Sequence, residues 1–153
     1  YGGAERVVLE ITESEGFENF DEVLSLTQQL RHMGGKIAID DFGTGYSSLS
    51  YLQKMPVDRL KLDQSFMQRI DHEENNRIIA GAVIALGEAM KINVIAEGIE
   101  HQEQETALRE LGCPEGQGYL YGMPLYADAL ESILRHRSKR AARGNQEADI
   151  TPD

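Results

Sequence analysis

The segment Lys36-Ile37-Ala38-Ile39-Asp40-Asp41-Phe42-Gly43-Thr44-Gly45 says more about the fold than any other part of the chain. Its first five residues predict a short strand buried on both faces, because apolar residues follow one another without polar alternation. Gly34-Gly35 ends the helix expected before this strand. A helix followed by a short buried strand is the repeating unit of a parallel α/β sheet.

The same unit recurs on both sides of this segment. Strands are predicted over 6–11, 36–40, 59–62, 93–97 and 118–120, and helices over 19–33, 47–54, 75–91, 101–111 and 127–140. In each of the two long helices, we expect the apolar side chains of one face to point toward the core. They are Phe20, Val23, Leu24, Leu30 and Met33 in the helix over 19–33, and Ile78, Ile79, Ala82, Val83, Leu86 and Met90 in the helix over 75–91. No hairpin signal separates the units, so the fold class is α/β, with about five parallel βα units. An open doubly wound sheet and part of a (β/α)₈ TIM-type barrel both fit.

Composition bounds the function. The chain has 153 residues, 41% of them apolar, which suits one globular domain over residues 1–143, with a disordered tail over 144–153. The formal net charge of −11 disfavours binding to a nucleic-acid polymer. A single cysteine, Cys113, points to a reducing compartment, and we expect a cytoplasmic protein, although a longer parent could be membrane-tethered. No apolar run reaches the length that crosses a bilayer.

Polar residues lie where each predicted strand ends. In parallel α/β folds these carboxyl ends form the functional face, so residues far apart in sequence should converge there. Carboxylates in such a cluster repel one another, and hard divalent cations such as Mg²⁺ or Mn²⁺ relieve the repulsion. A lysine among them could stabilise the charge of an attacking hydroxide or a phosphate. The residues concerned are Glu10, Asp40, Asp41, Lys61, Asp63, Glu97, Glu100 and Gln117.

Simpler explanations stand beside this one. A lone carboxylate at a strand end is more often solvated or capping a helix, so the argument depends on the whole group. The glycines of 41–45 match neither the dinucleotide-binding pattern nor a P-loop. The four histidines lack metal-ligand spacing, and Cys113 has no matching histidine motif.

Five segments together resemble the EAL-domain family, the bacterial cyclic-di-GMP phosphodiesterases. The similarity runs from about Val7 to Leu125, and the long central string is highly specific. The segments are Leu9-Glu10-Ile11-Thr12-Glu13, Asp40-Asp41-Phe42-Gly43-Thr44-Gly45-Tyr46-Ser47-Ser48-Leu49, Lys61-Leu62-Asp63, Ala96-Glu97-Gly98-Ile99-Glu100 and Gln117-Gly118-Tyr119-Leu120.

The resemblance implies a (β/α)₈-type barrel that uses two Mg²⁺ or Mn²⁺ ions to hydrolyse cyclic-di-GMP to 5′-pGpG. By this resemblance, Glu10 binds the first metal, Asp40 bridges both metals and Asp41 binds the second. Lys61 and Glu97 surround the hydrolytic water, with Glu97 as general base or metal ligand, and Gln117 contributes to the same site. By the same resemblance, Glu13 anchors the loop 41–49. Asp63 and Glu100 match family positions that bind the substrate or support the residues that do.

The sequence also departs from the family pattern. The Glu-Ala-Leu segment that names the family, and an asparagine that binds the first metal, would lie on strands before Val7. A complete barrel needs about 250 residues. We therefore expect an incomplete barrel and first metal site, and an isolated chain that is weakly active or inactive and forms a homodimer or other oligomer. Sensory or GGDEF-type domains could precede it in a longer parent.

Two alternatives to catalysis stay open. The chain could bind cyclic-di-GMP without cleaving it, or it could be an interaction module that pairs through its open sheet edge. Tight binding without hydrolysis would favour the first alternative. A dimer without nucleotide affinity would favour the second.

Overall fold

The computed structural model of the chain describes residues 7–14, 19–45, 49–131, 133 and 135. These residues divide into two units, Tyr1–Tyr121 and Gly122–Asp153. In the second unit, residues 127–131, 133 and 135 are helical, which agrees with the start of the helix expected over 127–140. The tail expected over 144–153 lies outside the described residues.

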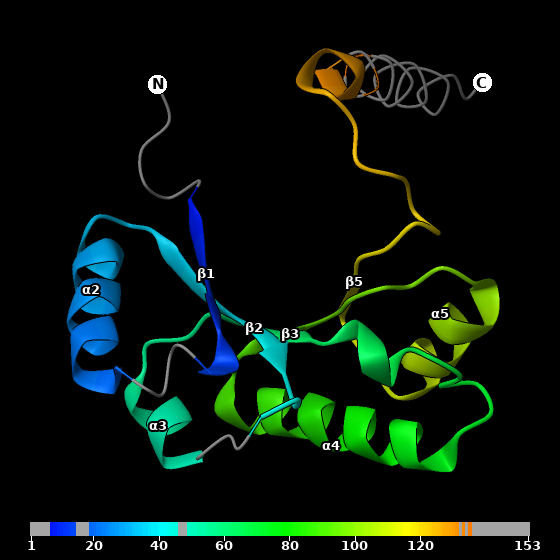
Figure 1. Ribbon diagram of the computed structural model, residues 1–153, viewed down its shortest axis with the longest axis horizontal. Coiled ribbons are helices and arrows are strands. Elements are labelled where there is room, and N and C mark those ends of the chain that lie inside the picture. The colour runs from blue at the N-terminus through cyan, green and yellow to red at the C-terminus, as the bar shows by residue number, and fades with distance from the viewer. Residues whose placement is uncertain (1–6, 15–18, 46–48, 132, 134, 136–153) are drawn as a thin grey trace, which may run out of the picture. The chain divides into compact units, whose positions relative to one another are not determined.

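The first unit is built on five parallel strands, which lie side by side in the order in which they occur along the chain (Figure 1). A doubly wound sheet reverses its strand order at a switch point, and no reversal occurs among these strands. The α/β class and the five parallel strands are therefore confirmed, with the order that consecutive units of a (β/α)₈ barrel have. The strands are β1 Val8–Thr12, β2 Lys36–Phe42, β3 Arg59–Leu62, β4 Asn93–Ala96 and β5 Glu115–Gly116.

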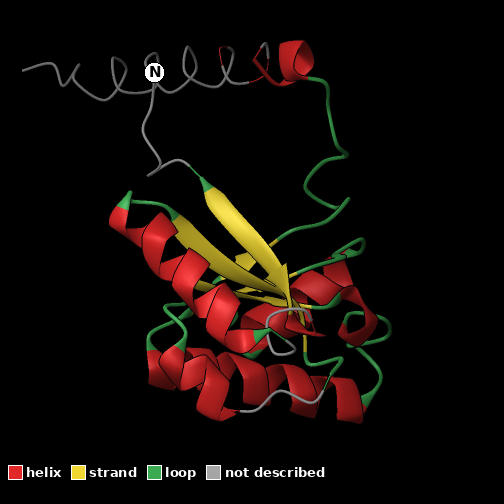
Figure 2. Cartoon of the chain, turned by 60° about the vertical axis from the view of Figure 1, so that its left-hand side comes forward, coloured by secondary structure: helices red, strands yellow, loops and turns green. Residues whose placement is uncertain are grey.

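Helices make the crossovers between the strands, and Figure 2 shows them gathered along the sheet. They are α2 Phe20–His32, α3 Leu49–Lys54, α4 Glu74–Met90 and α5 Gln102–Glu110. A short 3₁₀ helix, η2 Gln64–Phe66, follows β3 and was not predicted; Asp63 caps it by accepting a hydrogen bond from the Ser65 backbone N–H at 3.0 Å. Within the part of the chain that the structure describes, no helix is long and apolar enough to cross a membrane.

The core lies between the central strands and the helices. Ile39, Leu60 and Val94 stand in register on β2, β3 and β4 and are almost completely buried. Each such side chain contributes roughly 1.5–3 kcal/mol by leaving water. Successive side chains of a strand point to opposite faces of the sheet. The residues next to each of these three along its own strand therefore face away from the helices. The polar residues of the site lie on that second face.

The inward face of α4 differs from the prediction. Ile78 and Ile79 are 60% and 39% exposed, and Ala82 is exposed as well. The buried residues are Ala80, Val83, Ile84 and Gly87, which also follow helical spacing. A Cβ at Gly87 would overlap the side chain of Val94, so the helix approaches the sheet through its small residues. The prediction is confirmed for Val83, which is buried, and for Leu86 and Met90, which pack against the core. It is wrong for Ile78, Ile79 and Ala82.

Two further predictions need correction. Met33 was placed on the inward face of its helix, but it lies beyond the last turn and is 63% exposed. The fifth strand is Glu115–Gly116, three residues before the predicted Gly118-Tyr119-Leu120. The backbone turns at that place, with the Tyr121 N–H donating to the Gly118 carbonyl at 3.1 Å, and a Cβ at Gly118 would overlap the Ile99 backbone.

Candidate active site

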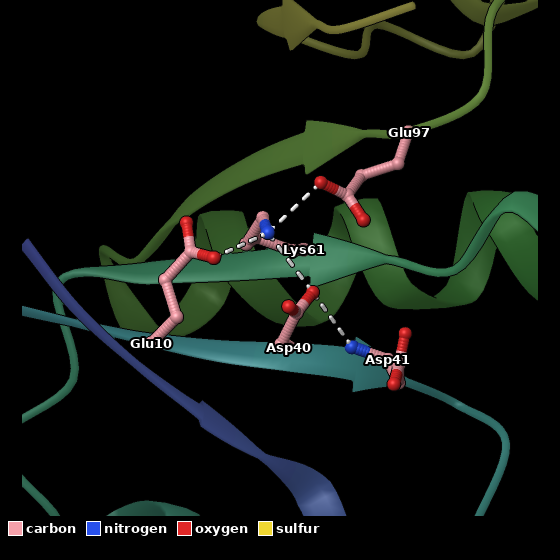
Figure 3. A network of polar contacts seen from close by, with 5 residues as sticks. All are labelled: Glu10, Asp40, Asp41, Lys61 and Glu97. Atoms are coloured by element: carbon pink, nitrogen blue, oxygen red, sulfur yellow. Dashed lines mark hydrogen bonds and ion pairs between the residues drawn. The ribbon is translucent and has the colours of Figure 1, made fainter.

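Lys61 stands at the centre of the polar cluster (Figure 3). Its Nζ lies 2.9 Å from Glu10 Oε2, 3.0 Å from Asp40 Oδ1 and 2.9 Å from Glu97 Oε1. Glu10 comes from β1, Asp40 from β2 and Lys61 from β3, while Glu97 directly follows β4. The parallel register therefore brings together residues that are up to 87 positions apart, from 10 to 97.

The surroundings of Lys61 keep its ammonium charged. Its side chain is only 8% exposed. Burial lowers the pKa of Lys61, but hydrogen bonds to Glu10, Glu97 and Asp40 outweigh burial and raise the pKa above its ordinary value. Lys61 is therefore a fixed cation at neutral pH, as the sequence predicted.

A bulge in β2 allows both aspartates to reach the site. Neighbouring residues of a regular strand point to opposite faces, which would separate Asp40 from Asp41. The pairing of β2 with β3 shifts between Ile39 and Phe42, and Asp41 has a positive φ of 54°. The Asp41 backbone N–H then donates to Asp40 Oδ1 at 3.0 Å. Carboxylate oxygens of Asp40, Asp41 and Glu97 consequently lie within 4.8 Å of one another.

Negative charge exceeds positive charge in this cluster. Burial raises the pKa of Asp41, and the nearby Asp40 and Asp63 carboxylates raise it further. Burial also raises the pKa of Glu97, against the lowering effect of Lys61. A divalent cation would relieve the repulsion, and a set of oxygen ligands fits the hard ions Mg²⁺ and Mn²⁺. The residues present therefore fit a site for such ions.

Glu13 connects the end of β1 to the loop after β2. Its side chain is buried, with the residue 2% exposed, and Oε2 accepts hydrogen bonds from the backbone N–H groups of Gly43 at 2.8 Å and Gly45 at 3.4 Å. Gly43 has a φ of +99°, which favours glycine at that position. These contacts agree with the loop-anchoring role predicted for Glu13; residues 46–48 of the loop lie outside the described residues.

A cavity of about 320 Å³ opens beside the carboxylates. Its walls include the three remaining predicted residues, Asp63, Glu100 and Gln117, together with Asp41 and Glu97. The structure thus brings every residue that was predicted at a strand end either to Lys61 or to this cavity.

Gln104 is a residue that sequence reasoning missed. It is buried within α5, and its Nε2 donates to the Met67 carbonyl at 2.9 Å. Its Oε1 accepts from the backbone N–H groups of Glu100 at 2.7 Å and His101 at 2.9 Å. It therefore holds the segment that carries Glu97 and Glu100. The spacing His101-x-x-Gln104 resembles half of a capping box and was the signal available in the sequence.

Comparison with known proteins bears on the family of the chain. The model of the EAL domain matches residues 2–124. A cyclic di-GMP phosphodiesterase from Pseudomonas aeruginosa, NbdA, is 45% identical over 127 residues, which are 83% of this chain and 16% of that protein.

Two solved structures have the same fold. The PaMucR phosphodiesterase in its c-di-GMP complex has a TM-score of 0.79 and 41% identity, over 83% of this chain and 51% of that chain. BlrP1 from Klebsiella pneumoniae, in a manganese and cy-diGMP complex at pH 6, has a TM-score of 0.72 and 36% identity, over 76% of this chain and 30% of that chain.

The chain thus spans about one sixth of the length of the curated relative and about half of the PaMucR chain. The match to the EAL model covers most of the residues of this chain, and the site residues lie on the matched strands or shortly after them. This chain belongs to the EAL domain family.

Proposed function

We propose that the chain contributes the metal and catalytic centre of a phosphodiesterase that hydrolyses cyclic-di-GMP to 5′-pGpG. One observation carries the proposal: a buried lysine is held by carboxylates from three neighbouring segments, with Asp41 directly beside them. The PaMucR and BlrP1 structures, which contain the same cyclic dinucleotide, support the choice of substrate.

Four carboxylates would hold two divalent ions. Glu10 and Asp40 would share one ion, and Asp41 would hold a second that also uses Asp40, with Glu97 either as a further ligand of that ion or as the general base. When bound, such ions polarise the phosphoryl oxygens and lower the pKa of a bound water. Mg²⁺ and Mn²⁺ both suit these oxygen ligands, and the manganese in the BlrP1 complex supports Mn²⁺ as the first ion to test.

The chain's own residues would supply the remaining chemistry. In the reaction, a water oxygen forms a bond to phosphorus, and one P–O3′ bond of the ring breaks. Lys61 would stabilise the negative charge that develops on the phosphoryl group, because Asp40 and Glu97 hold its ammonium within the site. Glu97, whose pKa is raised, is suited to accept the proton of the water.

The cavity beside the carboxylates would hold part of the nucleotide. Asp63, Glu100 and Gln117 line it and offer carboxylate and amide groups to a base or ribose. We assign these three residues to substrate binding, and Glu13 to fixing the loop that carries Gly43 and Gly45.

We also infer a cytoplasmic location, further domains in a longer parent, and a homodimer or other oligomer. The short span relative to NbdA supports the further domains. The exposed apolar residues Val8 and Leu9 of the edge strand β1 support an assembly that covers this edge.

Incubation with cyclic-di-GMP and Mn²⁺, followed by chromatographic separation of the nucleotides, tests the proposal. Because the isolated chain is expected to be weakly active or inactive, we expect at most a little 5′-pGpG with Mn²⁺, and none with EDTA or from an Asp40→Ala variant whose melting curve shows a folded protein. Tight binding of cyclic-di-GMP at saturating Mn²⁺ without any turnover would instead favour a binding module.

A further inference from the structure

The carboxylates of the site do not have equal surroundings. Asp40, Asp41 and Glu97 form a compact group whose oxygens lie within 4.8 Å of one another. Glu10 lies outside that group, and the ammonium of Lys61 stands between Glu10 and the others (Figure 3). The two metal positions of the proposed function therefore meet different competition.

A metal ion that uses both Glu10 and Asp40 needs oxygens that the lysine already engages. Nζ of Lys61 is 2.9 Å from Glu10 Oε2 and 3.0 Å from Asp40 Oδ1. An ammonium and a divalent ion bind the same oxygen lone pairs, and two cations bound to the same oxygens repel each other. Metal binding at this position must move the ammonium away from Glu10.

The lysine cannot simply be replaced by solvent cations. It belongs to β3, which pairs with β2 on one side and β4 on the other, and its side chain is 8% exposed. A tethered cation in a pocket acts at a high effective concentration. The Asp41 side of the compact group lacks such a direct competitor, since the ion pairs of Lys61 within the described residues are to Glu10, Asp40 and Glu97.

We propose that Lys61 is an internal competitor of the metal ions and makes their binding sequential. The position formed by Asp40, Asp41 and Glu97 fills first. That first ion draws on two carboxylates that also hold the ammonium and repels it, which lowers the cost of releasing Glu10 to the second ion. This inference rests on the two-metal site of the proposed function, and it adds an order of filling and a residue that sets it.

Mn²⁺ titration of the purified chain, with free Mn²⁺ followed by electron paramagnetic resonance, tests the proposal. We expect a tighter and a weaker binding event in the wild-type chain. Lys61→Met should tighten the weaker event by about tenfold, since it removes one close ion-pair competitor. Lys54→Met is the matched control, because it removes the same charge from an exposed position at the end of α3 and should change neither event.

Glu10→Gln separates the two positions. We expect this variant to keep the tighter event and to lose the weaker one. Lys61→Met added to it can then act only on the tighter event, through Asp40 and Glu97. A weaker event that is unchanged or weakened in Lys61→Met would overturn the proposal. Lys61→Gln, which keeps an uncharged donor, replaces the methionine variant in the titration if that variant does not fold.

Thermal unfolding in EDTA provides a second readout that needs no turnover. Lys61→Met should lower the melting temperature, because three carboxylates lose their shared cation, and Mn²⁺ should raise it more than in the wild type. Tightened Mn²⁺ binding in Lys61→Met, with neither cyclic-di-GMP binding nor any 5′-pGpG from the wild-type chain, would reject the proposed function and leave the competitor role standing. No Mn²⁺ binding to any variant would reject both.

Discussion

Strands β1 and β3 both carry residues of the site, yet their surroundings differ. The Glu10 side chain on β1 is 50% exposed and the Lys61 side chain on β3 is 8% exposed. Among the described strands, β1 pairs only with β2, whereas β3 pairs with β2 and β4. Val8 and Leu9 of β1 are 36% and 41% exposed, while Leu60 and Leu62 of β3 are fully buried. The centre of the sheet therefore fixes the lysine, and the lysine in turn fixes Glu10.

Strand β1 is exposed at its start but is held by hydrogen bonds just beyond its end. Just after β1, the buried Glu13 accepts hydrogen bonds from the backbone of the loop that follows β2. The exposed start of β1 and its anchored end thus differ within a few residues. Stability and function should respond differently to changes at these two places.

The largest expected effect compares two leucines, each of which is the second residue of its strand. Leu60→Ala on β3 should lower the free energy of unfolding by about 2–5 kcal/mol, because it leaves a cavity in a fully buried layer. Leu9→Ala on β1 should cost less than about 1 kcal/mol, because Leu9 is already 41% exposed. Urea unfolding followed by circular dichroism measures both. Equal costs would contradict the comparison and would mean that another chain covers β1 in solution.

The anchored end of β1 is tested by Glu13→Ala. Two glycine N–H groups lose their acceptor, and we expect the free energy of unfolding to fall by about 2 kcal/mol. Hydrogen exchange at Gly43 and Gly45 should accelerate. Glu22→Ala, on the exposed face of α2, is the matched control and should leave both quantities unchanged. If exchange at the two glycines stays the same, the loop does not depend on Glu13.

Gln104→Ala tests whether the Gln104 side chain holds the segment that follows β4 in place. Removing this buried amide leaves the Met67 carbonyl and the N–H groups of Glu100 and His101 without their partner, at a cost of about 1–2 kcal/mol. The affinity for Mn²⁺ should fall modestly, because Glu97 precedes the loosened segment. The exposed Gln28→Ala of α2 should change neither value, and a Gln104→Ala chain with unaltered stability would argue against the supporting role.

The smallest expected effect concerns pH. Burial raises the pKa of Asp41 and of Glu97, so these groups take up protons at a higher pH than ordinary carboxyl groups. Protons compete with metal, and Mn²⁺ affinity should therefore decrease as the pH is lowered, beginning above the usual range of Asp and Glu titration. Without metal the sign reverses: a raised pKa favours the protonated folded state, so these two groups stabilise the fold as the pH falls.

Mn²⁺ titrations at several pH values, from neutral down through the usual range of Asp and Glu titration, compared with melting temperatures in EDTA, measure the two effects. An Asp41→Asn chain should show a weaker dependence of Mn²⁺ affinity on pH. An Mn²⁺ affinity that begins to fall only within the usual titration range of Asp and Glu would contradict the raised pKa values.

Much of the fold could be predicted from the chain because its signals are local. Apolar runs bounded by glycine and polar residues placed β2, β3 and β4 within one or two residues of their observed ends. Parallel pairing then made the strand ends converge, which is why Glu10, Asp40, Lys61 and Glu97 could be grouped before any distance was known. Predictions failed where contacts between elements decide: the small-residue face of α4 at Gly87 depends on how closely Val94 approaches.

The sequence by itself thus determined the α/β class, the rhythm of the strands and the identity of the charged groups at their ends, because these depend on residue types and spacing along the chain. Only the tertiary structure decided that a bulge turns Asp41 toward Asp40, that Lys61 lies within 3.0 Å of three carboxylates, and that Gln104 supports the segment behind Glu97. The physical reason is that register, bulges and burial depend on what lies beside each strand, and neighbours in space are not neighbours along the chain.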